Sequence, residues 1–223
     1  MHFEILPPAQ RQFWDQHAAA VPQDFVLYGG TAVALRRGHR QSLDFDFFSS
    51  RVLDEDVLRR AIPILGTAKL LQRDPGTFVV AAPIADGEVR LSFFGGISFG
   101  RVGYPRALPN RPAIASPLDL LATKLKVIHE RVEAKDYLDI EVLLRAGLSL
   151  NQGISAARAL FGDAVNPLIT AKAVAWFKDG DLEAALPEAT RRFLEQASVT
   201  LDPATALTPM ALKSKDLSAS DPT

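Results

Sequence analysis

The chain has 223 residues, enough to bury one large core or two small ones. Its apolar fraction of 48% and charged fraction of 23% exclude a disordered or fibrous protein. Lys and Arg number 25 against 26 for Asp and Glu, so net charge gives no argument for a nucleic-acid partner, and the lack of cysteine excludes disulfides and thiolate metal sites. With neither a signal-peptide pattern nor a bilayer-spanning apolar run, we expect a cytoplasmic protein with no membrane partner.

The first part of the chain is expected to alternate helices and strands. Hydrophobic periodicity and breaker residues predict a helix, a strand, a helix and a strand over residues 9–20, 25–28, 31–37 and 43–48. The pair Gly29-Gly30 makes a tight turn between the first strand and the second helix. Because side chains on a strand repeat every second residue, Asp44 and Asp46 are expected on one face.

A region of hairpins follows this first part. Residues 54–62 suit a helix with Asp54 as its N-cap. Three strands are expected after it, over residues 68–72, 77–82 and 88–94. Residues 74–76 and the pair Asp86-Gly87 separate these strands and are turn signals. A small mixed or antiparallel sheet is therefore favoured.

Beyond Pro112 the composition changes to helix-forming residues. Pro117 suits the first turn of a helix over 118–131, and helices are expected to continue to about residue 197. The last residues are rich in Ser, Thr, Pro and Asp and predict a flexible tail. We therefore expect an α/β (α+β) protein with three parts: an α/β domain over 1–112, a helical domain over 113–200, and the tail over 201–223.

The turn and the acidic strand together suggest a phosphate and metal site. A glycine pair lets backbone amides approach a ligand, and the N-terminus of the next helix supplies free N–H groups and a positive dipole end, which favour phosphate. Two neighbouring carboxylates such as Asp44 and Asp46 are oxygen ligands for a hard cation such as Mg²⁺. Such a cation bridges the phosphates that are transferred in phosphoryl or nucleotidyl transfer.

Each of these features has an ordinary structural explanation. A glycine pair is usually only a turn, and an Asp-x-Asp is commonly a solvated strand face. The order of the features favours a site, because two like charges on an apolar strand are unfavourable without a compensating cation. His39 and Arg40 precede the acidic strand. At this position they could contact phosphate, compensate the negative charge of the aspartates, or simply be exposed loop residues.

Two segments carry a family resemblance. Residues 27–32 and 38–48, with Gly29-Gly30-Thr31 and Asp44-Phe45-Asp46, resemble the first motif of the nucleotidyl transferase AbiEii/AbiGii toxin family, within the DNA polymerase β-like nucleotidyltransferase superfamily. Residues 121–125 with Arg131, and then 135–140, are similar to a later helical motif of that family, a lysine followed by a basic-Asp-x-x-Asp pattern. The resemblance covers roughly residues 25–145.

The resemblance implies a polymerase β-like N-terminal half and assigns roles to individual residues. Its nucleotide-binding set comprises Gly29, Gly30, Thr31, Arg40, Ser42 and Lys124. Its metal ligands, for Mg²⁺ or Mn²⁺, are Asp44 and Asp46. The catalytic set adds Lys124, which contacts nucleotide phosphates, and Asp136, which activates an attacking hydroxyl.

The helical residues also have plainer interpretations. Lys135 and Asp139 are four residues apart and suit an exposed helical ion pair worth a few tenths of a kcal/mol. Arg131 also suits a solvated surface charge, and Lys124 lies beside an apolar helix stripe, where a lysine is often only the boundary.

The implied activity is metal-dependent transfer of a nucleoside monophosphate from an NTP to an acceptor hydroxyl, on a tRNA 3′ end or a protein. Family members act as toxins of toxin–antitoxin or phage-defence systems, which implies a cognate antitoxin as a partner. A strand at 89–94 carries Ser92 where related enzymes often place a third carboxylate. This departure keeps open a catalytically weakened nucleotide-binding or partner-binding module, and a glycosyltransferase with an Asp-x-Asp metal site is a further alternative.

Overall fold

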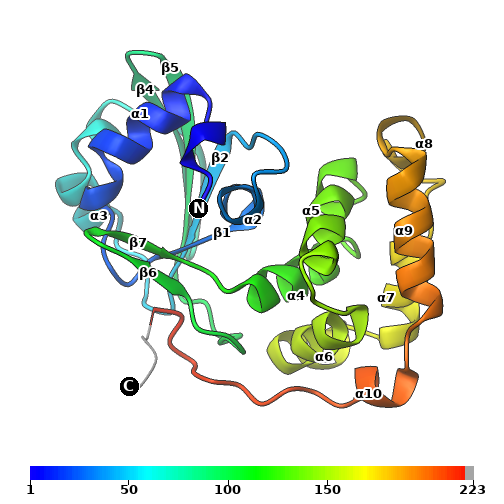
Figure 1. Cartoon of the computed structure of the whole chain (residues 1–223). Helices are drawn as coiled ribbons and strands as arrows, with labels where there is room; N and C mark the ends of the chain where they lie inside the picture. Colours follow the sequence, from blue (N-terminus) through cyan, green and yellow to red (C-terminus); the bar gives the residue numbers. More distant parts are fainter. Residues whose placement is uncertain (219–223) are drawn as a thin grey trace. The chain divides into compact units, whose positions relative to one another are not determined.

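The computed structural model describes residues 1–218, and the chain forms two compact units (Figure 1). The first unit comprises Met1–Ser116 together with the segment that begins at Ser214. The second unit is formed by the intervening residues, Pro117–Lys213. Among residues 1–218, no helix combines the length and the apolar character needed to cross a bilayer.

The first unit is built on a mixed sheet, which within the described residues has seven strands in the order β3-β4-β5-β2-β1-β7-β6. The strands are β1 Val26–Tyr28, β2 Asp44–Phe48, β3 Lys69–Asp74, β4 Thr77–Ile84, β5 Gly87–Phe94, β6 Arg106–Leu108 and β7 Arg111–Ile114. β1 pairs antiparallel with β2 and parallel with β7, whereas β2 pairs parallel with β5. The mixed α/β architecture expected from the sequence is confirmed, with β6 and β7 as additional strands.

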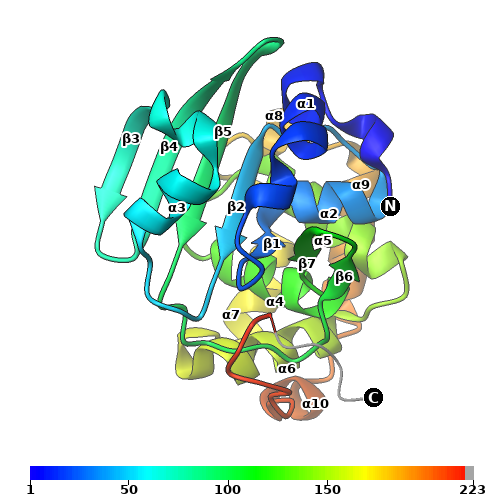
Figure 2. The same ribbon diagram turned by 90° about the vertical axis from the view of Figure 1, so that its left-hand side faces the viewer.

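Three α-helices accompany this sheet, α1 Pro8–Gln16, α2 Gly29–Arg37 and α3 Glu55–Ala61, and Figures 1 and 2 show α1 and α3 on the same side of it. Asp54 is the N-cap of α3, since its carboxylate accepts a 3.0 Å hydrogen bond from the Val57 amide. Gly38 ends α2 in the left-handed conformation, with φ of 68°. The N-cap at Asp54 was expected from the sequence.

An aromatic layer lies under one face of β2. Phe45 and Phe47 are fully buried, and the Phe45 ring packs 5.0 Å from the Phe13 ring of α1. The Phe47 ring stacks 5.3 Å from the Phe93 ring of β5. Because successive side chains on a strand point to opposite faces, this packing directs the side chains of Asp44 and Asp46 to the other face.

The second unit is helical. Its α-helices are α4 Pro117–Val127, α5 Ala134–Arg145, α6 Leu150–Phe161, α7 Pro167–Val174, α8 Leu182–Ala185, α9 Glu188–Val199 and α10 Pro203–Leu207. Leu121 and Leu125 of α4 lie against Gly153 of α6, which has no room there for a side chain. The first helix ends at Val127, four residues earlier than the pattern 118–131 indicated.

The segment expected to be a flexible tail contributes to both units. Residues 203–207 form α10, where Ala206 is buried. Farther along, the Arg101 amide donates a 2.9 Å hydrogen bond to the Ser214 carbonyl, and the buried Arg101 side chain donates to the Asp216 carbonyl at 3.0 Å. The described part of this segment is therefore held by specific contacts, and residues 219–223 lie outside the described residues.

Candidate active site

The turn between β1 and α2 brings backbone close to the acidic strand. Gly29 has φ of 69°, a conformation that L side chains rarely adopt, and it begins α2. A Cβ at Gly29 would overlap the carboxylate of Asp46. The first amides of α2 therefore lie beside that carboxylate, and only glycine permits both the backbone angle and the close approach.

We expect Gly29→Ala to destabilise the protein by roughly 1–3 kcal/mol, because the substitution combines backbone strain with a steric overlap at Asp46. Urea unfolding followed by circular dichroism measures the effect. Gly66→Ala is the matched control, since a Cβ there meets no atom within 4 Å. Equal stability of the two variants would contradict the proposed constraint at Gly29.

Asp44 and Asp46 are half-buried on the same face of β2, as the alternation predicted. In the sheet register, Asp46 lies between Tyr28 of β1 and Ser92 of β5. Asp44 lies beside Arg90 of β5, and cross-strand neighbours share a face. Among the register partners on the adjacent strands, Asp44 therefore has the cationic Arg90, and Asp46 has the uncharged Tyr28 and Ser92.

The other predicted nucleotide ligands surround this turn, except Lys124, which belongs to the second unit. A Cβ at Gly30 would overlap the Arg40 guanidinium and would lie 3.1 Å from Ser42 Oγ, so both side chains lie over the turn. The buried Thr31 hydroxyl donates a hydrogen bond to the backbone carbonyl of Asp44. Thr31 thus joins α2 to β2, and its hydroxyl is already engaged within the protein.

The donor set suits a hard cation. Carboxylate oxygens are the ligands that Mg²⁺ prefers, and Mg²⁺ commonly uses one or two carboxylates together with waters and substrate phosphates. Within residues 1–218, no group of three or more His, Asp or Glu side chains is placed to hold a metal ion. The pair Asp44 and Asp46 therefore fits a cation whose remaining ligands come from phosphate and water.

Ser92 occupies the sheet position beside Asp46 that a third carboxylate would take. The two residues are register partners on the parallel strands β2 and β5, and Ser92 is buried. A hydroxyl is a weaker Mg²⁺ ligand than a carboxylate. The residue that the sequence analysis singled out for lacking a carboxylate therefore lies directly beside Asp46 in the sheet.

The second unit contains a cluster of four charges, in which Lys124, Asp136 and Asp139 are buried and the Arg131 side chain is 47% exposed. Lys124 of α4 lies 2.6 Å from Asp136 and 2.7 Å from Asp139, both on α5. Arg131 binds the same Asp136 carboxylate, with Nε 2.9 Å from Oδ2. Both aspartates are fully buried, and only 6% of the Lys124 side chain is exposed. The cluster thus balances two carboxylates with two cations inside the helical unit.

This cluster corrects three interpretations of the sequence. Lys135 does not pair with Asp139; its ammonium group lies 2.6 Å from Glu133, and Asp139 turns inward to Lys124. Lys124 is not a solvated boundary residue, and Arg131 is not a free surface charge. The spacing of Asp136 and Asp139 could have revealed their shared role, since residues three apart face the same side of a helix.

Asp136 is ionised in this environment. Burial opposes the charged carboxylate, but the nearby charge of Lys124 and the hydrogen bonds from Arg131 and Lys124 outweigh burial and lower the pKa of Asp136 below its ordinary value of 3.8. Ionised Asp136 therefore contributes stability above about pH 3.8, and this contribution is lost as the pH falls from there through the lower folded-state pKa.

A pH series tests this linkage. We expect Asp136→Asn to be less stable than wild type near neutral pH, with a difference that narrows as the pH falls below 3.8. Urea unfolding at several pH values between neutrality and acid measures it. A difference that stayed constant across this range would show that the charge of Asp136 is not what stabilises the cluster.

Two basic residues of the helices, Arg36 and Lys126, are engaged with other groups of the protein. Arg36 donates hydrogen bonds of 2.7 and 2.9 Å to the carbonyls of Ala115 and Ile114. In the second unit, Lys126 lies 2.5 Å from Glu130. The positions of basic residues in the sequence are therefore a weak guide to the binding surface of this protein.

Comparisons with known proteins agree with the two-motif pattern. Residues 13–210 match the family model described as nucleotidyl transferase AbiEii toxin, type IV toxin–antitoxin system. The chain is 33% identical over 132 residues to an uncharacterized protein of Aquifex aeolicus (strain VF5); the match covers 55% of this chain and 58% of that protein's length.

Solved structures share the fold. A putative nucleotidyltransferase from Helicobacter pylori matches with a TM-score of 0.53 at 18% identity, over 82% of this chain and 88% of that one. MenT4, a nucleotidyltransferase toxin from Mycobacterium tuberculosis H37Rv, matches with a TM-score of 0.53 at 16% identity, over 82% of this chain and 78% of that one. At these identities the likeness shows the fold alone. With a family model matched over most of its length, the chain belongs to the nucleotidyl transferase AbiEii toxin family of type IV toxin–antitoxin systems.

Proposed function

We propose that the protein transfers a nucleoside monophosphate from an NTP to an acceptor hydroxyl, with Mg²⁺ or Mn²⁺ bound at Asp44 and Asp46. One observation carries the proposal: the two half-buried carboxylates share a face of β2, and the start of α2 at Gly29 lies directly beside Asp46. Phosphate favours a helix N-terminus, and a hard cation favours the carboxylates, so a metal-bound triphosphate satisfies both.

In this mechanism the chain mainly positions and polarises its substrates. The acceptor oxygen forms a bond to the α-phosphorus as the bond to the bridging oxygen breaks, and pyrophosphate leaves with the electron pair. The amides of Gly29, Gly30 and Thr31 and the guanidinium of Arg40, with Ser42 beside it, orient the triphosphate. Asp44 and Asp46 would hold the cation, which would supply positive charge to neutralise the transferring group.

Lys124 and Asp136 stay in the proposed catalytic set on the strength of the family motif. Asp136 is ionised, which is the state that accepts a proton from the acceptor hydroxyl. Its lowered pKa makes it a weak base while Lys124 and Arg131 hold it. We therefore propose that Asp136 mainly orients and polarises the acceptor hydroxyl, and that it does not remove the hydroxyl proton before the oxygen attacks the phosphorus.

Ser92 beside Asp46 favours one second candidate, a site that binds nucleotide and reacts slowly or not at all. Membership of a nucleotidyl transferase family argues against the glycosyltransferase alternative. For the acceptor we propose a tRNA 3′ end first and a protein side chain second, and a cognate antitoxin as the protein partner, in line with the family.

Incubation with each α-phosphate-labelled NTP, Mg²⁺ or Mn²⁺, and total tRNA tests the function. Label that enters RNA with wild type, and not with the double variant Asp44→Ala plus Asp46→Ala, supports the proposal and identifies the acceptor class. Label that enters protein instead of RNA identifies a protein side chain as the acceptor. Nucleotide binding without any transfer would support the second candidate.

A further inference from the structure

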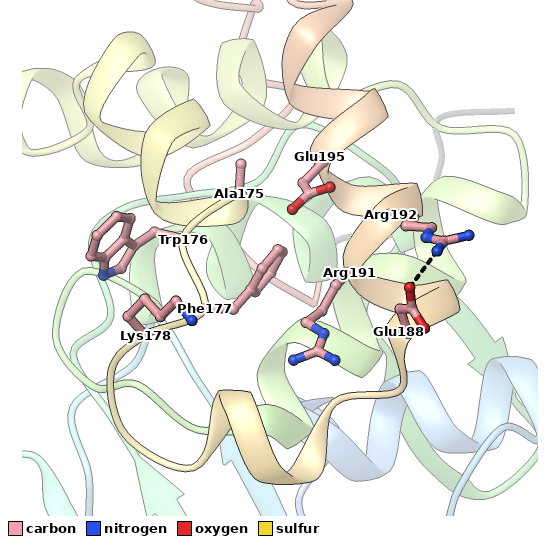
Figure 3. Close-up of a pocket in the computed structure, with 8 residues that line it drawn as sticks. All are labelled: Ala175, Trp176, Phe177, Lys178, Glu188, Arg191, Arg192 and Glu195. Atoms are coloured by element: carbon pink, nitrogen blue, oxygen red, sulfur yellow. Dashed lines mark hydrogen bonds and ion pairs between the residues drawn. The ribbon is translucent and has the colours of Figure 1, made fainter.

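A pocket of about 390 Å³ lies in the second unit, between the end of α7 and helix α9 (Figure 3). Its lining is Ala175, Trp176, Phe177, Lys178, Glu188, Arg191, Arg192 and Glu195. The combination of two aromatic rings, three cations and two carboxylates differs from both an apolar cleft and a simple anion site. No role in the proposed transfer has been assigned to any of these residues.

The aromatic part of the pocket is fixed in place. Trp176 is 49% exposed, and its indole nitrogen donates a 2.8 Å hydrogen bond to Asp179, which orients the ring. Phe177 is buried, and its ring meets the Tyr137 ring edge-on at 6.2 Å. In Figure 3 Phe177 lies between Trp176 on one side and Arg191 on the other. An exposed, pre-oriented indole is a surface on which a planar base can stack.

The charges around the rings suit a phosphate. Arg192 pairs with Glu188, and Lys178 lies 2.7 Å from Glu183, both as surface ion pairs, which are worth little and exchange readily. Arg191 donates a 3.2 Å hydrogen bond to the Glu183 carbonyl. Its charge adds to the effect of Lys178 in lowering the pKa of the Glu183 carboxylate, but within residues 1–218 Arg191 forms no ion pair with a carboxylate closer than 4 Å. Its guanidinium is therefore the cation best able to bind a phosphate oxygen.

Glu195 also lines the pocket and forms no ion pair within residues 1–218, and Figure 3 shows it on the same helix as Arg191. A carboxylate repels phosphate but accepts a hydrogen bond from the exocyclic amino group of cytosine. Uracil has a carbonyl at the same position and cannot donate. The lining thus pairs a phosphate-binding arginine with a base-reading carboxylate and a stacking indole.

We propose, building on the proposed nucleotidyl transfer, that this pocket binds one base and its phosphate from a single-stranded RNA acceptor, with a preference for cytosine over uracil. The pocket also adjoins the buried charge cluster within the same unit. Phe177 contacts Tyr137, which follows Asp136 in α5, and Asp181 accepts a 2.7 Å hydrogen bond from the Ala134 amide at the start of that helix. An RNA strand bound at Trp176 would therefore lie next to α5, the helix that carries Asp136.

The two tryptophans give a direct measurement. Trp14 is buried and Trp176 is half-exposed, so quenching of fluorescence on adding ligand reports on Trp176. We would titrate wild type with twelve-nucleotide cytidine and uridine RNA oligomers and with free CMP, without NTP or metal. The cytidine oligomer should quench and should bind most tightly, and its affinity should fall with added salt.

Substitutions assign the signal to the pocket. By anisotropy of a labelled cytidine oligomer, Trp176→Ala and Arg191→Ala should each weaken binding roughly tenfold, with Trp176→Phe and Arg191→Lys recovering part of the loss. Glu195→Ala should reduce the preference for cytidine over uridine. Leu168→Ala, at an exposed position of α7 outside the lining, and Arg60→Ala, an exposed arginine of the first unit, should leave affinity unchanged.

Two results would overturn the assignment. Binding that survives both Arg191→Ala and Trp176→Ala would place the RNA elsewhere, and equal affinity for the cytidine and uridine oligomers would contradict the base preference. A pocket built for a protein partner predicts no response to either oligomer. Because RNA binding is measured without NTP or metal, the result does not depend on nucleotide transfer. A protein that transfers no nucleotide can still bind the cytidine oligomer at this pocket, and a protein that transfers nucleotides can still fail to bind it there.

Discussion

Asp46→Asn is expected to lower nucleotide transfer on the order of 10³-fold or more, because it removes a charged metal ligand at the reacting phosphate. The fold should be retained, since the substitution keeps the side-chain volume and relieves repulsion with Asp44 on the same strand face. Initial rates of label incorporation at saturating NTP measure the activity, and thermal unfolding measures the fold.

The control is Asp56→Asn, an exposed carboxylate in the first turn of α3. It changes net charge by the same amount in the same unit and should leave transfer unaltered. A Mn²⁺ titration adds a second observable, because the loss of a ligand should weaken metal binding whether or not the acceptor is known. Full activity in Asp46→Asn would reject Asp46 as a metal ligand.

Lys124→Met is expected to destabilise the helical unit by about 3–5 kcal/mol, since it leaves two buried carboxylates with only Arg131 to compensate them. Methionine retains most of the apolar stem, so the effect reports mainly on the charge. Chemical unfolding measures it, and the double variant with Asp139→Asn should recover part of the loss because one uncompensated carboxylate is removed.

Lys126→Met is the matched control two residues farther along α4. Its partner Glu130 is exposed, and a surface pair of this kind contributes about 0–1 kcal/mol. If the two lysine variants were equally stable, the buried cluster would not be the electrostatic element that the geometry indicates.

The fold class could be predicted because local patterns agreed with the tertiary structure. The alternation in residues 43–48 placed Asp44 and Asp46 on one face, and the turn signals after β3 and β4 marked real hairpins. β6 and β7 could not be predicted in the same way. They are short, Pro109 lies in the turn between them, and Pro112 lies within β7, although a proline normally argues against a strand.

The site was predictable only where its members are close in sequence. The proximity of Gly29 and Asp46 follows from one helix between two paired strands. By contrast, the spacing of Asp136 and Asp139 shows that they share a helix face but not which cation they meet, because a local pair of Asp139 with Lys135 satisfies the spacing rule as well as the observed pair with Lys124. The pocket beside Trp176 depends on the packing of α7 and α9 and carries no sequence motif.

The return of the chain to the first unit has a consequence for proteolysis. The helical unit is inserted between Ser116 and Ser214, so it is tethered at both ends, and its unfolded form is a closed loop with less conformational freedom than a free chain. A single protease cut near Pro117 would not release it, because the Arg101 contacts with Ser214 and Asp216 still hold the downstream fragment. Two cuts are needed to separate the units, and a nicked protein should elute intact on a sizing column under native conditions.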